Sequence, residues 1–339
     1  MTTSVAAPVT PERIMQFAWG YVPPLLLEAA IRHRIFDLLD AGPKTVLEIK
    51  KETGASERGL TAVMNALVGL DFLAKDKQGY FSLTPESSAF LVSTNPGFMG
   101  GMIRHGSEQL IPKWLQLNKI VMTGEPDAAV NKEALGGDFF QHFVNDIFPL
   151  SYPAAQVLSR HYNSNGAVPA ARVLDLAAGS GVWGIAMAQA SEKVSVTAVD
   201  WPEVIPVTRK TVTRFGLANR FSFIEGDLLQ VDFGSGHNLA TLGHILHSEG
   251  SERSQALLKK TFQALAPGGT ISIAEFLVNA DRTGPLNALF FAVNMLVNTE
   301  SGDTYSFEEI SSWLEAAGFT DARKLDAPGP SPLILATKP

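Results

Sequence analysis

The sequence predicts an α/β fold with a doubly wound, mostly parallel, Rossmann-like sheet, preceded by an α-helical winged-helix domain. Three observations carry this prediction. From residue 171 to residue 277, apolar strand-like runs alternate with helical patterns, which is the order of a parallel sheet with crossover helices. A glycine-rich loop follows the first of these runs. The last two runs, 319–325 and 332–337, are joined by a short Pro/Gly turn and must pair antiparallel.

The N-terminal part has a different pattern. Apolar side chains at helical spacing over residues 12–40 precede two shorter helical runs and two short alternating runs at 72–74 and 80–83. Two helices with a tight turn followed by a hairpin are typical of a winged helix. Its second helix carries a single basic residue, Arg58, so we expect it to pack against protein rather than read DNA. We place this domain at 1–105, and the helical linker region with the Rossmann-like domain at 106–339.

Composition narrows the function classes. The 339 residues have a formal net charge of −7 and no run rich in Lys and Arg, which argues against nucleic acid or an anionic membrane as partner. The chain has no cysteine, so disulfides, thiolate zinc sites and cysteine nucleophiles are excluded. The N-terminus lacks a basic start followed by an apolar region, and we expect no apolar stretch near the ~20 residues of a membrane span. We therefore expect a cytoplasmic chain that acts on a small molecule.

The most informative segment is VLDLAAGSGVWG at 173–184. Its last six residues also match G-x-G-x-x-G, the fingerprint of dinucleotide binding. Asp175 precedes Gly179 by four residues, and a carboxylate at the mouth of a pyrophosphate site would repel the phosphates. S-adenosylmethionine has no phosphates and carries a cationic amino group and a sulfonium. The segment therefore favours a methyl-donor site, and a nicotinamide-dependent oxidoreductase is the alternative.

Two acids follow at later strand ends. Asp200 closes the second strand about twenty residues after the loop, where an acid hydrogen-bonds ribose hydroxyls in such folds. Trp201 is placed either to wall an adenine ring or to pack as a partly buried core aromatic. Asp227 follows the third strand, in position to accept a hydrogen bond from the adenine amine.

A histidine and a glutamate mark the fourth and fifth strand ends. His247 lies just past the fourth strand, where a histidine can accept the proton of a hydroxyl that attacks a methyl group. Glu275 ends the fifth strand and can orient the imidazole. We interpret His244 as a satisfied helix or core residue. A metal site of His244, His247 and Glu249 is not favoured, because these residues span one turn and nothing signals a further ligand elsewhere.

In order and spacing, these residues and the glycine loop resemble the S-adenosylmethionine-dependent O-methyltransferases of the caffeate, acetylserotonin and hydroxyneurosporene type. The winged helix matches as well, so the resemblance covers nearly the whole chain. In that family the winged helix is a dimerisation domain whose N-terminal segment closes the partner's substrate pocket. The resemblance therefore implies a homodimer.

Carried over residue by residue, the resemblance places the general base on His247 and its supporting acid on Glu275. It assigns the donor site to residues at three strand ends, namely Asp175, Gly179, Gly181, Asp200, Asp227 and Leu228. The segment Phe143 to Pro149 resembles a family stretch near donor and substrate, with Ile147 in the position of its methionine. The family's substrate-facing helix falls on Phe290, Phe291, Asn294 and Met295, which as an alternative are ordinary core and interface positions.

The chain departs from the family pattern at four places. Ala177 stands where the first loop glycine is usual, and Gly243 replaces a lysine. Ser248-Glu249 replaces Asp-Trp after the base, and Thr304-Tyr305-Ser306 replaces Glu-Arg-Thr. A second carboxylate beside the base would then have to come from Asp303 or Glu300.

We predict an S-adenosylmethionine-dependent methyltransferase that methylates a hydroxyl on a small aromatic or polyketide-like molecule. Transfer of the methyl group to oxygen is direct and in line, with no metal. The alternatives are the oxidoreductase above, methylation of nitrogen or carbon, chemistry without methylation, and a regulator that uses the winged helix on DNA.

Overall fold

The computed structural model describes residues 9–126, 129–130, 139–140, 143–164, 171–329 and 331–339. The chain divides into two compact units, Met1–Ile111 and Pro112–Pro339.

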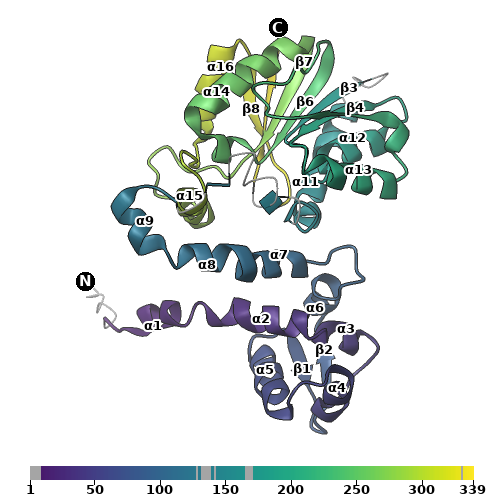
Figure 1. Cartoon of the computed structure of the whole chain (residues 1–339), viewed down its shortest axis with the longest axis vertical. Helices are drawn as coiled ribbons and strands as arrows, with labels where there is room; N and C mark the ends of the chain where they lie inside the picture. The colour runs from purple at the N-terminus through teal and green to yellow at the C-terminus, as the bar shows by residue number, and fades with distance from the viewer. Residues whose placement is uncertain (1–8, 127–128, 131–138, 141–142, 165–170, 330) are drawn as a thin grey trace, which may run out of the picture. The chain divides into compact units, whose positions relative to one another are not determined.

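The N-terminal unit is built from helices and one two-stranded sheet (Figure 1). A capping box between Thr45 and Glu48 starts one helix, and the hydroxyl of Ser56 caps the next. An antiparallel hairpin follows these two helices, which confirms the predicted order of helix, helix and hairpin. The elements are α1 (Glu12–Ala18), α2 (Val22–Arg32), α3 (Ile35–Asp40), α4 (Val46–Thr53), α5 (Glu57–Gly69), β1 (Leu73–Lys75), β2 (Phe81–Leu83), α6 (Pro85–Phe90), α7 (Gly100–His105) and the π-helix η1 (Gly106–Leu110).

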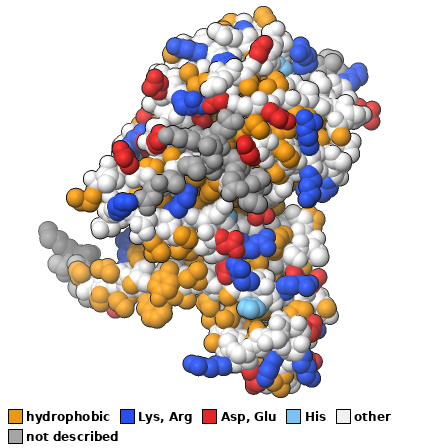
Figure 2. All heavy atoms as spheres, viewed as in Figure 1, with side chains coloured by type: hydrophobic (Ala, Val, Ile, Leu, Met, Phe, Trp, Pro, Cys, Tyr) orange, Lys and Arg blue, Asp and Glu red, His pale blue; other side chains and the backbone are white. Residues whose placement is uncertain are grey.

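An apolar stripe runs along α1 and α2. Figure 2 shows hydrophobic side chains gathered over these helices. The expectation that no apolar stretch nears the length of a membrane span was wrong here, because Glu12–Arg32 passes on length and composition, with a mean hydropathy of 1.2. Only 11% of its most apolar window is buried. The exposed members of the stripe are Ile14, Met15, Phe17, Trp19, Tyr21 and Leu25.

The second unit is a seven-stranded sheet in the order β5-β4-β3-β6-β7-β9-β8. The first five of these strands are parallel to one another, and β9 pairs antiparallel with both β7 and β8. The predicted Rossmann-like sheet with an antiparallel last strand is confirmed. The strands are β3 (Arg172–Leu176), β4 (Ser195–Asp200), β5 (Phe221–Glu225), β6 (His237–Gly243), β7 (Leu265–Ala274), β8 (Thr320–Leu325) and β9 (Leu333–Thr337).

Helices cover both faces of this sheet (Figure 1). Side chains that alternate along each strand feed two cores. Val173 packs with α11, α12 and α13, whereas its neighbour Leu174 packs with α14 and α16. The helices of this part of the chain are α8 (Ile111–Trp114), which begins at the unit boundary, α9 (Leu117–Thr123), α11 (Phe148–Ser164), α12 (Val182–Ala190), α13 (Ile205–Arg214), the 3₁₀-helix η2 (Ala218–Arg220), α14 (Leu246–Ala264), α15 (Leu286–Asn298) and α16 (Phe307–Ala317).

The strand order changes direction at β3. This strand pairs with β4 on one side and with β6 on the other, so the connections leave it toward both edges of the sheet. Ligands of open α/β sheets bind in the crevice at the carboxyl ends of the strands at such a switch point. The glycine loop after β3 and the histidine after β6 both lie at this edge.

One residue of the loop has a strained backbone. Ala177 has a φ of 50°, in the left-handed region that glycine adopts freely and alanine does not. This explains why a glycine suits the position better than the alanine of this chain.

We expect Ala177→Gly to stabilise the protein. Relief of the left-handed strain is worth up to about 1 kcal/mol, which would raise the midpoint of thermal unfolding by roughly 1–2 °C. Ala178→Gly is the matched control, because Ala178 has no positive φ and its methyl group is buried, so this change should lower the midpoint. A fall in the midpoint for Ala177→Gly would contradict the strain.

Candidate active site

The glycine loop turns tightly between β3 and α12. Gly179 has a φ of 54° and Gly181 a φ of 78°, so both need the conformational freedom of glycine. Gly181 is the N-cap of α12, which begins at Val182. Gly184 has no room for a side chain, because a Cβ there would lie 2.7 Å from Val196 Cγ1. Gly184 therefore serves the packing of helix on sheet, as expected from an incidental fingerprint match.

Asp175 lies beneath the loop and not at its mouth, which corrects the reason for which the sequence singled it out. The side chain is fully buried. Its Oδ1 accepts a hydrogen bond from Thr241 Oγ1 at 2.7 Å, and its Oδ2 accepts one from the Gly184 N–H at 3.0 Å. Burial raises the pKa of this carboxyl to about 7, although the two hydrogen bonds favour the ionised form. Asp175 thus shapes the loop from below.

Asp200 connects the second strand end to the loop. Its Oδ2 accepts a hydrogen bond from the Gly179 N–H at 2.7 Å, and its Oδ1 accepts one from the Trp201 N–H at 2.8 Å. Burial raises the pKa of Asp200 to about 6 against these two bonds. A carboxylate offers about four lone-pair positions, so two remain for hydroxyl donors. The half-buried ring of Trp201 lies 6.0 Å from the ring of Phe140.

Asp227 is held by an arginine that the sequence did not single out. Arg253 Nη2 lies 2.7 Å from Asp227 Oδ2, and Arg253 Nε lies 2.6 Å from Glu249 Oε2. The Leu229 N–H donates to Asp227 Oδ1 at 2.8 Å. Glu249, which stands where the family has tryptophan, is buried, and burial raises the pKa of its carboxyl. The arginine therefore bridges the acid after β5 and the start of α14.

Leu228 contributes a buried side chain to the core on the α14 side of the sheet. Its carbonyl accepts a hydrogen bond from Lys260 Nζ at 2.9 Å, and Lys260 also donates to the carbonyl of Val231. Any contact of Leu228 with a ligand would therefore use the backbone or the edge of the side chain.

His247 and Glu275 form a buried dyad. Glu275 Oε2 lies 2.7 Å from His247 Nδ1, and Glu275 Oε1 accepts a hydrogen bond from the His247 backbone N–H at 3.2 Å. Burial alone would raise the pKa of Glu275, but the electrostatic attraction and the hydrogen bonds of His247 prevail and lower it. An ionised carboxylate only accepts hydrogen bonds, so Nδ1 carries a proton, and in the neutral imidazole the lone pair then lies on Nε2. Within the described part of the chain, no group hydrogen-bonds this Nε2.

Residues outside α14 hold its first turn in place. The helix α14 begins at Leu246, just after β6, and bends at Gly250, which has a φ of 78°. A Cβ on Gly250 would lie 2.6 Å from Ser301 Oγ, so only glycine allows this approach. The Asp303 N–H donates to the carbonyl of His247 at 2.9 Å. The dyad is thus clamped by the segment after α15.

Asp303 does not supply a second carboxylate to the base. Its Oδ2 lies 3.0 Å from Arg282 Nη1, which also holds the carbonyl of Thr304. Glu300 is exposed on the same segment. The acid that orients His247 is Glu275.

Aromatic rings lie beside the imidazole of His247. The edge of His247 meets Phe291 at a centroid distance of 4.8 Å, and Phe291 stacks on Phe276 at 4.0 Å. Both phenylalanines are half-buried, whereas Phe290 is 56% exposed. Met295 is buried further along α15.

Asn294 is tied to a residue before the Rossmann-like sheet. Its Oδ1 accepts hydrogen bonds from Trp114 Nε1 at 3.0 Å and from Asn298 Nδ2 at 3.1 Å. The sequence placed Asn294 on a ligand-facing helix but did not foresee Trp114 as its partner.

The segment 143–149 packs close to the loop. A Cβ on Gly179 would lie 3.3 Å from Val144 Cγ1, which places this segment over the glycine turn. Phe143 and Ile147 are half-buried in it, and the ring of Phe143 lies 6.1 Å from that of Phe139.

Gly243 lacks the side chain that a lysine would place here, and a tryptophan explains why. A Cβ on Gly243 would overlap Trp183 Nε1 and the neighbouring ring atoms. Trp183 belongs to the first turn of α12 and is 4% exposed. The indole therefore fills the space beside the end of β6.

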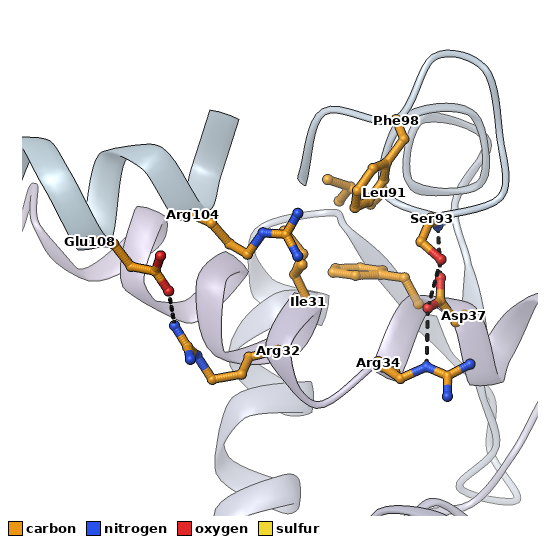
Figure 3. Close-up of a pocket in the computed structure, with 10 residues that line it drawn as sticks. Ile31, Arg32, Arg34, Asp37, Leu91, Ser93, Phe98, Arg104 and Glu108 are labelled. Carbon is orange, nitrogen blue, oxygen red and sulfur yellow. Dashed lines mark hydrogen bonds and ion pairs between the residues drawn. The ribbon is translucent and has the colours of Figure 1, made fainter. Parts of the chain in front are cut away.

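A separate cavity lies in the N-terminal unit, between α2, α3, α7 and the segment after α6 (Figure 3). Its volume is about 600 Å³. Arg32 pairs with Glu108 at 2.6 Å and Arg34 with Asp37 at 3.4 Å, so most of its charge is compensated. None of the site residues predicted from the sequence lines this cavity. Among the described residues, no cluster of three His, Asp or Glu side chains could hold a metal ion.

Comparisons with known proteins show the family of this chain. Residues 155–320 match the family model of the O-methyltransferase domain, and residues 15–93 match that of the O-methyltransferase dimerisation domain. The chain belongs to the O-methyltransferase family. It is an S-adenosylmethionine-dependent O-methyltransferase, and the oxidoreductase alternative finds no support in the comparisons.

Three relatives span almost the whole chain. The 3-hydroxy-5-methyl-1-naphthoate 3-O-methyltransferase of Streptomyces sahachiroi is 27% identical and covers 97% of this chain and 95% of its own. The tetracenomycin polyketide synthesis 8-O-methyl transferase of Streptomyces glaucescens is 26% identical, with 97% of each chain covered. The S-adenosyl-L-methionine-dependent methyl transferase PigF of a Serratia species is 28% identical, covering 94% of this chain and 93% of its own. The solved structure of PigF with SAH superposes with a TM-score of 0.87, at 25% identity over 98% of this chain and 100% of that one.

The described residues fit the donor of this enzyme family. Two glycines in the left-handed region let the loop approach a ligand without side chains. Asp200 retains acceptor positions for hydroxyl groups, and the acids around the loop suit a cationic ligand without phosphates.

We expect the affinity for S-adenosylhomocysteine to depend on pH through Asp200. The pKa of about 6 lies above the ordinary value, so this carboxyl gains a proton as the pH falls through 6 and no longer accepts from two donors. If binding needs the ionised form, affinity rises about tenfold from pH 5 to pH 7 and then levels off. Isothermal titration calorimetry measures it.

Asp200→Asn should bind more weakly and show no rise over this window. The exposed Asp326→Asn is the matched control and should keep the wild-type profile. A wild-type affinity that stays constant between pH 5 and pH 7 would contradict the dependence on Asp200.

Proposed function

We propose that His247 is the general base for methylation of a hydroxyl on a small aromatic or polyketide-like acceptor. The observation that carries the proposal is the dyad, in which the Glu275 carboxylate accepts the hydrogen bond of the Nδ1–H and leaves the Nε2 lone pair of His247 available. S-adenosylmethionine supplies a methyl group whose bond to sulfur breaks as the acceptor oxygen bonds to it. Nε2 takes the proton of that hydroxyl, and Glu275 stabilises the resulting imidazolium.

The aromatic nature of the acceptor is supported by the rings next to the base. Phe291 meets the edge of His247, and Phe276 stacks on Phe291. Half-buried rings offer flat apolar surface to another ring. Two of the relatives carry a naphthoate and a tetracenomycin polyketide in their names, which favours a fused-ring acceptor here. We place Phe143, Ile147, Asn294 and Met295 around the same acceptor.

We further propose that the glycine loop and the acids after β4 and β5 hold the donor. Gly179 and Gly181 would approach it by backbone, with Asp200 on the ribose and Trp201 beside the adenine ring. Asp227 and the Leu228 backbone would take the adenine edge, and Arg253 holds the Asp227 carboxylate in place through its ion pair at 2.7 Å. Asp175 would contribute by shaping the loop, since its two carboxylate oxygens are bonded within the fold.

A homodimer is the assembly we propose. The dimerisation-domain match covers residues 15–93, and the apolar stripe on α1 and α2 lies mostly within it. Large exposed apolar patches on soluble proteins mark interfaces. A second copy on this stripe would also bury the segment long enough to cross a membrane, so we propose that the enzyme works in the cytoplasm.

We expect His247→Ala to lower the turnover number at least ~10²-fold, because the general base is removed. The affinity for S-adenosylhomocysteine should stay within about threefold, since His247 does not hold the donor. Turnover is measured as methyl transfer from labelled S-adenosylmethionine to the best acceptor in a panel of fused-ring phenols. His33→Ala changes an exposed histidine of the N-terminal unit and is the matched control. Near-normal turnover of His247→Ala would remove the base assignment.

We expect the double variant Phe17→Glu, Trp19→Glu to be monomeric where the wild type is a dimer. These side chains are 66% and 61% exposed in a single chain, and four added carboxylates per dimer interface oppose burial. Light scattering coupled to size-exclusion chromatography gives the mass. Leu47→Glu on α4 replaces another exposed apolar side chain outside the stripe and should leave the dimer intact. A dimeric double variant would show that the interface lies elsewhere.

A further inference from the structure

A second histidine stands in the wall of the proposed acceptor site. His244 follows the end of β6, three residues before His247, and its ring is half-buried. The centroids of the two imidazoles are 6.4 Å apart, and both rings contact Phe276, at 5.3 and 6.1 Å. From its sequence context we expected His244 to be a packing residue, but its surroundings indicate a further role.

The backbone of His244 is held in an uncommon conformation. Its φ is 62°, in the left-handed region, and its N–H donates to the carbonyl of Ala274 at 2.9 Å. A non-glycine residue in this region costs about 1 kcal/mol or more, and such residues cluster at functional sites. Glycine would adopt this backbone conformation without strain. The presence of a histidine here therefore indicates a role for its imidazole side chain.

The imidazole of His244 is anchored at one nitrogen. Its Nε2 lies 2.9 Å from the hydroxyl of Ser331, a buried residue just before β9. No group in the described part of the chain hydrogen-bonds its Nδ1. Two imidazoles of the same wall therefore each keep one nitrogen without a partner, Nδ1 of His244 and Nε2 of His247.

From this arrangement we propose that His244 determines acceptor specificity by hydrogen-bonding, through Nδ1, a second oxygen next to the hydroxyl that His247 deprotonates. The acceptor class is then an aromatic ring with two neighbouring hydroxyl groups, held between the imidazoles and against Phe276. This assignment rests on the proposed function of His247. It goes further by naming the group that lies beside the reacting oxygen.

Geometry and charge select a hydroxyl as this second group. Each imidazole nitrogen can reach an oxygen about 2.8 Å away, so ring centroids 6.4 Å apart can bracket two oxygens on neighbouring carbons. The Ser331 hydroxyl can donate or accept, so Nδ1 is an acceptor in one tautomer and a donor in the other. A hydroxyl group can donate to Nδ1 or accept from it, so it suits either tautomer. Burial lowers the pKa of His244 to about 4, so the ring is neutral at pH 7 and gives a carboxylate no charge to pair with.

The test is equilibrium binding of two matched phenols to the protein saturated with S-adenosylhomocysteine. 2,3-Dihydroxynaphthalene carries both hydroxyls, and 2-naphthol lacks the second one. We expect the wild type to bind the diol about 3- to 10-fold more tightly, the effect of one hydrogen bond. His244→Gly, which suits the positive φ, should bind the two phenols equally. His244→Asn, which tolerates this backbone region and keeps a polar group, should retain part of the preference.

Further variants and controls separate the outcomes. Ser331→Ala leaves the imidazole of His244 but removes the hydroxyl that anchors it. The preference of this variant for the diol should therefore lie between those of the wild type and His244→Gly. The affinity for S-adenosylhomocysteine and the thermal midpoint report on folding in each variant. Equal binding of both phenols by the wild type, or an undiminished preference in His244→Gly, would overturn the role of His244 and leave that of His247 standing. If neither phenol binds, the aromatic acceptor of the proposed function fails, and this assignment fails with it.

Discussion

The buried carboxylate of Glu275 is the constraint on which the acceptor side of the site depends. It lies one residue beyond β7 and accepts from both the backbone N–H and Nδ1 of His247, which belongs to the first turn of α14 after β6. A carboxylate without partners in this position would be costly, and so would a buried imidazolium. Because β6 and β7 are paired up to Gly243 and Ala274, the sheet register sets where the two groups meet. The position of His247 and the partner of its Nδ1 thus follow from one strand pairing.

The switch in strand order divides the carboxyl edge of the sheet into two parts. The ends of β3, β4 and β5 carry the loop and the acids that we assign to the donor, whereas the ends of β6 and β7, with α15, carry the imidazoles and rings that we assign to the acceptor. Arg253 joins the two halves, because it bonds Asp227 after β5 and Glu249 in α14. This ion-pair network ties the proposed donor side of the sheet edge to the start of α14, which carries His247.

The strand-end residues could be predicted from the sequence, because the local pattern of apolar residues shows where each strand ends. Asp200 and Glu275 fall at strand ends for this reason, and their bonds to the loop and to the base follow from parallel pairing. Asp175 was found by the same spacing, but its burial under the loop depends on Thr241 of a neighbouring strand. Arg253 and Ser331 were missed because they meet their partners across 26 and 87 residues of chain, and no local pattern marks such contacts.

The central claim is that Glu275 accepts the hydrogen bond of the His247 Nδ1–H, so that Nε2 is left to act as the base. The ¹⁵N chemical shifts of the imidazole nitrogens test this directly, in the protein saturated with S-adenosylhomocysteine at pH 7.5. The chain has seven histidines, so loss of one signal set in His247→Gln assigns the resonances. We predict the shifts of the tautomer with Nδ1 protonated and Nε2 unprotonated. A proton on Nε2 in place of Nδ1 would contradict the account.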